Sequence, residues 1–268
     1  MTRLSDEHIV SINRRLPLLE QRYLRITGKN MLDIARYAAG TEYLPLRQRK
    51  TLSVACVPIT AGEGLIGHFC ETVAGILEAF ADVKAYVTEA TDVRGFNEAI
   101  VRDADLVFMA DDDMCLCRNL RTGATSDNGY ATGRAFASLL YLAMKEKITE
   151  DVLILGAGKV GVGAYSFLRK KGLDALHWFD ICRQTAFSGP LDSERYAVDW
   201  QNREWRYLID ATTCPTFIDS DQVRADAVLA APGIPFGLTE GAVEKAELVI
   251  HDELETGIMV MFCEAMRG

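Results

Sequence analysis

The clearest indication of this chain's fold is the stretch Val152-Leu-Ile-Leu-Gly156-Ala-Gly158-Lys-Val-Gly161. Four apolar residues typical of a buried strand lead directly into a G-x-G-x-x-G turn, and residues with helical spacing follow. Strand, glycine-rich turn and helix in this order are the fingerprint of a Rossmann dinucleotide-binding unit. Gly156 allows the tight turn, Gly158 lets the backbone approach a pyrophosphate, and Gly161 permits close contact between helix and strand. The alternative, a Rossmann-like fold that binds no cofactor, stays open.

A second strand is predicted over residues 175–179, and it ends in Asp180. At about twenty residues beyond the glycines, an acid accepts hydrogen bonds from the adenine ribose and repels a 2′-phosphate. The sequence therefore favours NAD over NADP, although Arg183 lies close to this acid. The helix that follows the turn offers free N–H groups to phosphate oxygens.

Three later apolar runs, at residues 207–211, 227–231 and 248–250, have the spacing of further Rossmann strands. We expect the turn after the first run to lie near the adenosine half of the cofactor, and the turn after the second near the nicotinamide. Ordinary strand-to-helix turns are the alternative for both. The expected cofactor-binding residues are Gly156, Gly158, Lys159, Val160, Gly161, Asp180, Thr212, Cys214, Pro232, Gly233 and Ile234.

The first half of the chain alternates strand and helix patterns. Apolar runs at residues 52–57, 85–87 and 106–109 alternate with helical spacing, and a glycine-rich turn follows the first run. This alternation of strands and helices predicts a parallel sheet. An amphipathic helix is expected before it, kinked or divided at Pro17. The predicted fold class is therefore α/β, with an N-terminal helical segment and smaller parallel α/β substrate domain over 1–148 and a Rossmann NAD-binding domain over 149–268.

Composition excludes several classes of function. The chain has 268 residues, of which 49% are hydrophobic, and a formal net charge of −9. That charge repels nucleic acid and anionic membranes, so neither is an expected partner. The seven cysteines are scattered and odd in number, which predicts reduced thiols and no metal site. Because no signal peptide or membrane-spanning pattern is visible, we expect a cytoplasmic location. The oligomeric state stays open, although homodimers are common among dehydrogenases of this size.

Polar residues follow two of the predicted strands and are candidates for binding and proton transfer. Asp111, Asp112 and Asn128 come after the strand at residues 106–109, at the edge where ligands of α/β sheets bind. A helix N-cap for the aspartates and a plain turn at Asn128 are the alternatives. His251 and Asp252 end the last strand, and we favour Asp252 as the group that acts on a substrate amine, against a surface strand end.

Several motifs here are unusual in combination. They are residues 57–67 (VPITAGEGLIG), Met109-Ala-Asp-Asp112, Asn119-Leu, Asn128 with Thr132-Gly133, the glycine loop, Asp210-Ala-Thr-Thr-Cys214 and Ala231-Pro-Gly-Ile-Pro235. Over roughly residues 54–257 the chain resembles the pyrrolysine-forming dehydrogenases, the last enzymes of pyrrolysine biosynthesis. The resemblance implies NAD-dependent oxidation of a dipeptide-like small molecule, 3-methylornithine joined by an isopeptide bond to the side-chain amine of lysine. Its terminal amine becomes an aldehyde, which condenses with the ornithine α-amine and closes a pyrroline ring with loss of water.

The resemblance also implies a substrate site. Its expected substrate-binding residues are Leu4, Thr60, Ala61, Ile66, Phe69, Ala110, Asp112 and Asn128, with Asp111 and Asp252 as catalytic candidates. The family pattern has Glu-Pro-Leu-Gly where this chain reads Asp-Glu-Leu-Glu at residues 252–255. Which acid replaces the family glutamate therefore stays open.

Two other functions fit the same two-domain plan. One is a different NAD-dependent amino-acid dehydrogenase or an imine reductase, because a fold does not determine its substrate. The other is a non-catalytic NAD-sensing module. Turnover of an amine substrate distinguishes the enzymes from the sensor.

Overall fold

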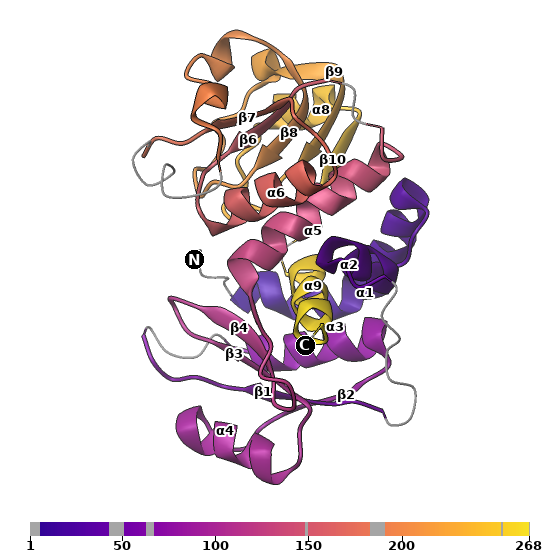
Figure 1. Cartoon of the computed structure of the whole chain (residues 1–268), viewed down its shortest axis with the longest axis vertical. Helices are drawn as coiled ribbons and strands as arrows, with labels where there is room; N and C mark the ends of the chain where they lie inside the picture. Colours follow the sequence, from indigo (N-terminus) through magenta and orange to yellow (C-terminus); the bar gives the residue numbers. More distant parts are fainter. Residues whose placement is uncertain are drawn as a thin grey trace. The chain divides into compact units, whose positions relative to one another are not determined.

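A computed structural model describes residues 6–42, 51–62, 67–147, 150–182, 191–252 and 254–267. The chain forms two compact units (Figure 1). The first is built from the chain up to Ala131 together with the segment that begins at Leu254, and the second from residues 132–253. The predicted boundary at residues 148/149 is thus wrong in two respects: it falls too late, and the C-terminal segment returns to the first unit.

The second unit contains the Rossmann sheet. Its strand order is β10-β9-β8-β6-β7, and every pairing is parallel, as expected from the alternating pattern. The strands are β6 (Val152–Leu155), β7 (Leu176–Phe179), β8 (Trp205–Asp210), β9 (Val223–Ala230) and β10 (Leu248–Ile250). The other elements are α5 (Asn128–Ala143), α6 (Lys159–Lys170), η1 (Ser193–Arg195), η2 (Trp200–Asn202), η3 (Ser220–Gln222) and α8 (Glu240–Lys245).

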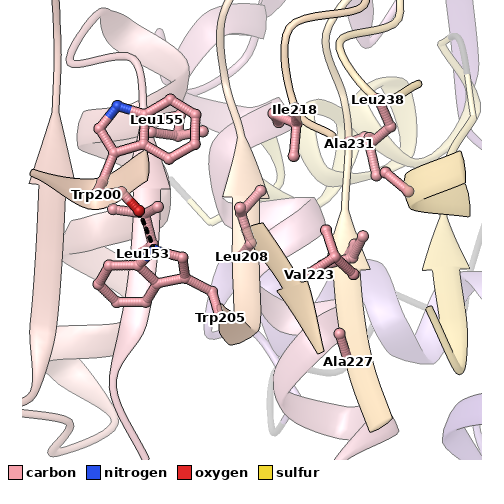
Figure 2. Packing of buried hydrophobic residues seen from close by; sticks show 12 residues of the cluster. Leu153, Leu155, Trp200, Trp205, Leu208, Ile218, Val223, Ala227, Ala231 and Leu238 are labelled. Carbon is pink, nitrogen blue, oxygen red and sulfur yellow. Dashed lines mark hydrogen bonds between the residues drawn. The ribbon is translucent and has the colours of Figure 1, made fainter. Parts of the chain in front are cut away.

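Side chains of β6 alternate between two faces of this sheet, as strand geometry requires. Leu153 and Leu155 belong to a buried cluster with residues of η2, β8, β9 and α8. Figure 2 shows this packing and the bond in which Trp205 Nε1 donates to the Trp200 carbonyl at 2.9 Å. On the other face, Ile154 approaches α6, since a Cβ on Gly161 of that helix would lie 3.5 Å from the Ile154 side chain. The sheet is therefore covered on both sides, as parallel sheets usually are.

The first unit contains a mixed sheet of order β2-β1-β3-β4-β5. Its strands are β1 (Ser53–Val57), β2 (Lys84–Val87), β3 (Leu106–Ala110), β4 (Cys115–Asn119) and β5 (Thr125–Asp127). The first three pair in parallel as predicted, but β4 and β5 pair antiparallel. The expectation of an all-parallel sheet is corrected here because the polar segment after β3 folds into hairpins rather than one long loop. Asp111 closes the first turn, since its Oδ1 accepts the N–H groups of Asp113 and Met114.

Helices of the first unit pack on both faces of this sheet. They are α1 (Asp6–Thr27), α2 (Met31–Ala39), α3 (Phe69–Ala81), α4 (Asp92–Val101) and α9 (Glu255–Ala265). α4 covers a small core of β1 and β3 residues that includes Val57 and Val107. α9 packs against α2 and α3 (Figure 1), and nearly all of it is buried. Asn119 Nδ2 donates to the Ala265 carbonyl at 3.1 Å, and Ser126 Oγ donates to Glu264 Oε2 at 2.6 Å. These bonds attach the C-terminal helix to the first sheet.

α1 is a single helix although Pro17 lies within it. The predicted division at this proline is wrong, because apolar side chains on both sides of it, including Ile12 and Tyr23, are fully buried. Their burial offsets the backbone hydrogen bond that the proline removes.

The seven cysteines are free thiols, as expected. Among the described residues, no helix is long and apolar enough to cross a membrane.

Candidate functional site

The glycine loop after β6 has the geometry that a pyrophosphate requires. Gly156 has φ +91°, and a Cβ there would lie 2.5 Å from the Ala211 carbonyl oxygen. A Cβ on Gly161 would overlap the Gly156 carbonyl, so both positions need glycine. Gly158 caps α6 and is exposed, and a Cβ there would meet nothing within 4 Å. This open space at a helix N-terminus fits the phosphate groups of a dinucleotide.

Asp180 lies beside this loop, at the end of β7. Its Oδ2 accepts the N–H of Ala157, within the loop, at 2.6 Å, and its Oδ1 accepts the N–H of Cys182 at 2.7 Å. The Tyr196 hydroxyl donates to the Asp180 carbonyl at 3.0 Å. A carboxylate has about four lone-pair sites, so two such bonds leave acceptor capacity for ribose hydroxyls. Next to it, Ile181 is 95% exposed.

The other predicted cofactor residues lie at the same edge of the sheet, after β8 and β9. Thr212 and Gly233 come together, since a Cβ on Gly233 would lie 2.5 Å from the Thr212 carbonyl oxygen. The exposed Cys214 donates its N–H to Thr212 Oγ1 at 3.2 Å. Pro232 and Ile234 are half-buried on either side of Gly233. At the start of α6, Lys159 is exposed and Val160 half-buried. Parallel strands thus bring these turns to one edge of the sheet.

Sequence reasoning missed a buried acid at this edge. Asp210, the last residue of β8, is fully buried, and its Oδ1 accepts both the N–H of Thr212 at 3.0 Å and its Oγ1–H at 2.8 Å. Burial raises the pKa of Asp210 to about 6, although the Thr212 bonds, the Gly237 amide and the charge of His251 oppose the rise. The signal that could have revealed it is an acid at the end of an otherwise largely apolar strand.

The two polar residues that follow β10 differ in how deeply they are buried. His251 is half-buried, its Nδ1 lies 2.6 Å from the Ala231 carbonyl oxygen, and its ring meets Phe236 edge-on at 4.9 Å. Asp252 is only 3% exposed. The alternative in which Asp252 is a surface strand end is therefore wrong, because this carboxyl is inside the protein.

In the first unit, the turn after β1 is held by two aspartates. The N–H of Thr60 donates to Asp92 Oδ1 at 2.8 Å, and its Oγ1–H donates to Asp92 Oδ2 at 2.7 Å. These bonds lower the pKa of Asp92. Two residues on, Gly62 has φ +75°, and any Cβ there would overlap the Asp112 carboxylate. Asp112, predicted from the sequence, thus lies against the turn that contains Thr60, and Asp92 is a contributor that the sequence did not reveal.

The strand register brings further candidates to this edge. Ala110 ends β3 and pairs with Cys115, and Asp127 pairs with Leu116. Asn128, the next residue and the start of α5, therefore lies at the same end of the sheet as the Asp111 turn. The expectation that the aspartates could form a helix N-cap is wrong, because Asp111 caps a hairpin turn instead.

The remaining substrate candidates are less well placed. Phe69 begins α3 and is half-buried, while Ala61 is exposed in the turn after β1. Leu4 and Ile66 lie outside the described residues.

Comparison with known proteins identifies the family. Residues 8–126 match the family described as pyrrolysine biosynthesis protein PylD, N-terminal domain. A pyrrolysine synthase from Methanosarcina acetivorans is 30% identical over 254 residues, which cover 94% of this chain and 95% of that protein. A second, from Methanosarcina barkeri, is 29% identical over 263 residues, with 94% of this chain and 93% of that protein covered.

Solved structures share the fold at low sequence identity. Quinate dehydrogenase from Corynebacterium glutamicum in complex with NAD has a TM-score of 0.52 and 13% identity, covering 81% of this chain and 93% of that one. The bifunctional FolD methylenetetrahydrofolate dehydrogenase/cyclohydrolase from Campylobacter jejuni has a TM-score of 0.54 and 11% identity, covering 92% and 94%. These likenesses concern the α/β fold alone, whereas the sequence matches extend along the chain. The chain therefore belongs to the family of the pyrrolysine biosynthesis protein PylD, whose curated relatives are named pyrrolysine synthase.

Proposed function

We propose that this protein is a dehydrogenase of pyrrolysine biosynthesis that uses NAD to oxidise the terminal amine of 3-methylornithinyl-N6-lysine. The single observation that carries the proposal is the glycine loop with Asp180 bonded to it, in a chain whose relatives are named pyrrolysine synthase. Family membership supports the pathway, and the loop supports a nicotinamide dinucleotide as the oxidant.

The preference for NAD over NADP rests on Asp180. Its carboxylate lies at the end of β7, where the adenine ribose of a dinucleotide is held in this fold. A 2′-phosphate there would place two anions in contact, while ribose hydroxyls would donate to the free lone pairs. When bound, the nicotinamide supplies a hydride acceptor.

The reaction balances with NAD, which would accept the hydride, and water as the only other reactants. The carbon that bears the terminal amine loses a hydride and the amine loses protons, which leaves an imine. Water adds to that imine and ammonia departs, so an aldehyde remains. The ornithine α-amine then attacks the aldehyde, and loss of water closes the pyrroline ring.

Residues of the first unit are proposed to hold the substrate. It carries ammonium groups, which favour carboxylate and amide partners such as Asp111, Asp112 and Asn128. Asp112 contributes most in this proposal, because it lies against Gly62 in a turn that Asp92 holds in place. Ala61, Ala110 and Phe69, with Leu4 and Ile66, are proposed as the surrounding wall.

An unprotonated amine is needed before hydride loss, so a proton acceptor is required. We assign this role to Asp252. It is buried, and it follows β10 at the carboxyl-end edge of the Rossmann sheet, where the nicotinamide half of a dinucleotide is held in this fold.

The test is NADH formation, followed by its near-ultraviolet absorbance, from NAD and synthetic 3-methylornithinyl-N6-lysine, with the product identified by mass spectrometry. The proposal expects NADH and a pyrroline product in equal amounts. Oxidation of other amino acids instead would make the protein a different amino-acid dehydrogenase or an imine reductase. Tight NAD binding with no turnover of any amine would favour a sensing module.

A further inference from the structure

The buried carboxylate of Asp210 lies between two segments at the carboxyl end of the Rossmann sheet, those that follow β8 and β9. In the sheet register Asp210 lies opposite Leu155, the residue directly before the glycine loop. Its Oδ1 accepts two hydrogen bonds from Thr212 in the turn after β8. On its other side the Gly237 backbone, in the segment after β9, approaches so closely that any Cβ there would overlap Oδ2. One carboxylate thus borders both segments, next to the strand that leads into the glycine loop.

Backbone hydrogen bonds join these two segments to each other. The N–H of Thr216 donates to the Phe236 carbonyl at 3.1 Å, and the N–H of Phe217 donates to the Gly237 carbonyl at 2.8 Å. The segments that follow β8 and β9 therefore form one assembly, and Asp210 lies in its interior. Oδ2 has no hydrogen-bond partner in the described part of the chain, although the Gly237 amide faces it. The close approach of the Gly237 backbone therefore confines this oxygen.

The position of this assembly relates it to one half of the cofactor. In the strand order, β7 lies on one side of β6, and β8 and β9 lie on the other. Asp180, at the end of β7, marks the adenosine side. A dinucleotide that crosses the glycine loop must therefore continue over the ends of β8 and β9. The nicotinamide would rest on the surface that Thr212 and Gly233 form together.

We propose that Asp210 is a positioning residue for the nicotinamide half of the cofactor site, because its carboxylate holds the segments after β8 and β9 in register. This inference rests on the proposed function. Asp210 is too deeply buried to touch the cofactor, so its effect passes through Thr212 and the neighbouring turn.

Asp210→Asn tests the proposal, since an amide keeps one acceptor but places an NH₂ group against one of the two backbone N–H groups that the carboxylate faces. The affinity of the purified variant for NADH and for ADP is measured by titration. Loss of a charge-assisted bond is expected to weaken NADH binding about tenfold or more, while ADP, which needs only the glycine loop and Asp180, changes by less than about twofold.

A matched control removes the same charge elsewhere in the unit. Asp226 on β9 is ion-paired with Arg224 and Arg206, and Asp226→Asn is expected to leave both affinities unchanged. If Asp210→Asn does not fold, Thr212→Val and Thr212→Ser replace it, because only the serine keeps the hydroxyl that donates to Asp210. The valine variant is then expected to weaken NADH binding several-fold more than the serine variant.

Equal NADH affinity in wild type and Asp210→Asn would overturn the proposal, as would an equal loss of NADH and ADP binding. A wild-type protein that binds no NADH at all would overturn the proposed function itself, and this result is distinct from either of the others.

Discussion

The carboxyl-end edges of the two sheets hold their aspartates in different ways. Asp210 in the second unit is fully buried, and its carboxylate accepts hydrogen bonds from the backbone N–H and the hydroxyl of Thr212. Asp112 in the first unit is half-buried beside an exposed turn. A buried acid of this kind organises the backbone around it, while an accessible acid can meet a charged ligand. The backbone therefore forms most of the cofactor edge, whereas side chains form most of the proposed substrate edge.

The largest expected effects come from two glycines of the loop, one needed for both folding and NADH binding and the other for NADH binding alone. Gly161→Ala places a Cβ on the Gly156 carbonyl, so we expect loss of NADH binding together with about 3 kcal/mol of the free energy of unfolding. Gly158→Ala meets no protein atom, so stability should stay unchanged while NADH binding falls about 100-fold, because the pyrophosphate approaches there. Calorimetry and NADH titration measure the two quantities. Equal behaviour of the two variants would contradict this account of the loop.

The buried acid should leave a signature in the pH dependence of stability. The folded-state pKa of Asp210 is raised from 3.8 to about 6, so the folded protein holds this proton more tightly than the unfolded chain does. The wild type should therefore lose up to about 3 kcal/mol relative to Asp210→Asn as pH rises from about 4 to about 6, with no further relative change above that.

Denaturant unfolding of both proteins across this pH range measures the difference. Parallel stability curves would mean that Asp210 is not the buried acid described here.

The substrate edge should respond to charge rather than to shape. We expect Asp112→Asn to lower kcat/KM for the dipeptide-like substrate about 30-fold, since it removes a charge-assisted contact to an ammonium group, and to leave NADH affinity unchanged. The neighbouring Asp113 is exposed, and Asp113→Asn serves as the matched control with little expected effect. Similar losses in both variants would show that general electrostatics, rather than a specific contact, governs this edge.

The smallest expected effect concerns Asp180, which both accepts a backbone hydrogen bond within the loop and is proposed to contact the cofactor. Asp180→Ala removes the acceptor of the Ala157 N–H and the proposed acceptor of the ribose hydroxyls. NAD affinity should fall about tenfold, and the preference over NADP should narrow because the repulsion of the 2′-phosphate is lost. Titration with both cofactors measures this, with the exposed Asp199→Asn as control. An unchanged ratio of the two affinities would remove Asp180 from cofactor selection.

Prediction from sequence succeeded best where a single segment contains the whole signal. The strand, turn and helix around Gly156–Gly161 were confirmed because their geometry depends on near neighbours in the chain. The antiparallel β4 and β5 were missed, since β4 is short and ends in Arg118 and Asn119 while β5 is entirely polar, so neither contains the long apolar run that marks a buried strand. Asp92 was missed for a different reason. Its bond to Thr60 joins residues 32 positions apart, which no local pattern records.

Three properties could be predicted from the amino-acid sequence alone: the Rossmann fingerprint, the parallel α/β character of the second sheet and the family of this chain. Only the tertiary structure decided that α9 returns to the first unit, that Asp210 is buried beneath the turns after β8 and β9, and that the Thr60 turn lies between Asp92 and Asp112. The physical reason is common to all three. Local spacing specifies strands and turns, whereas burial and hydrogen bonding between distant segments arise only when the segments pack together.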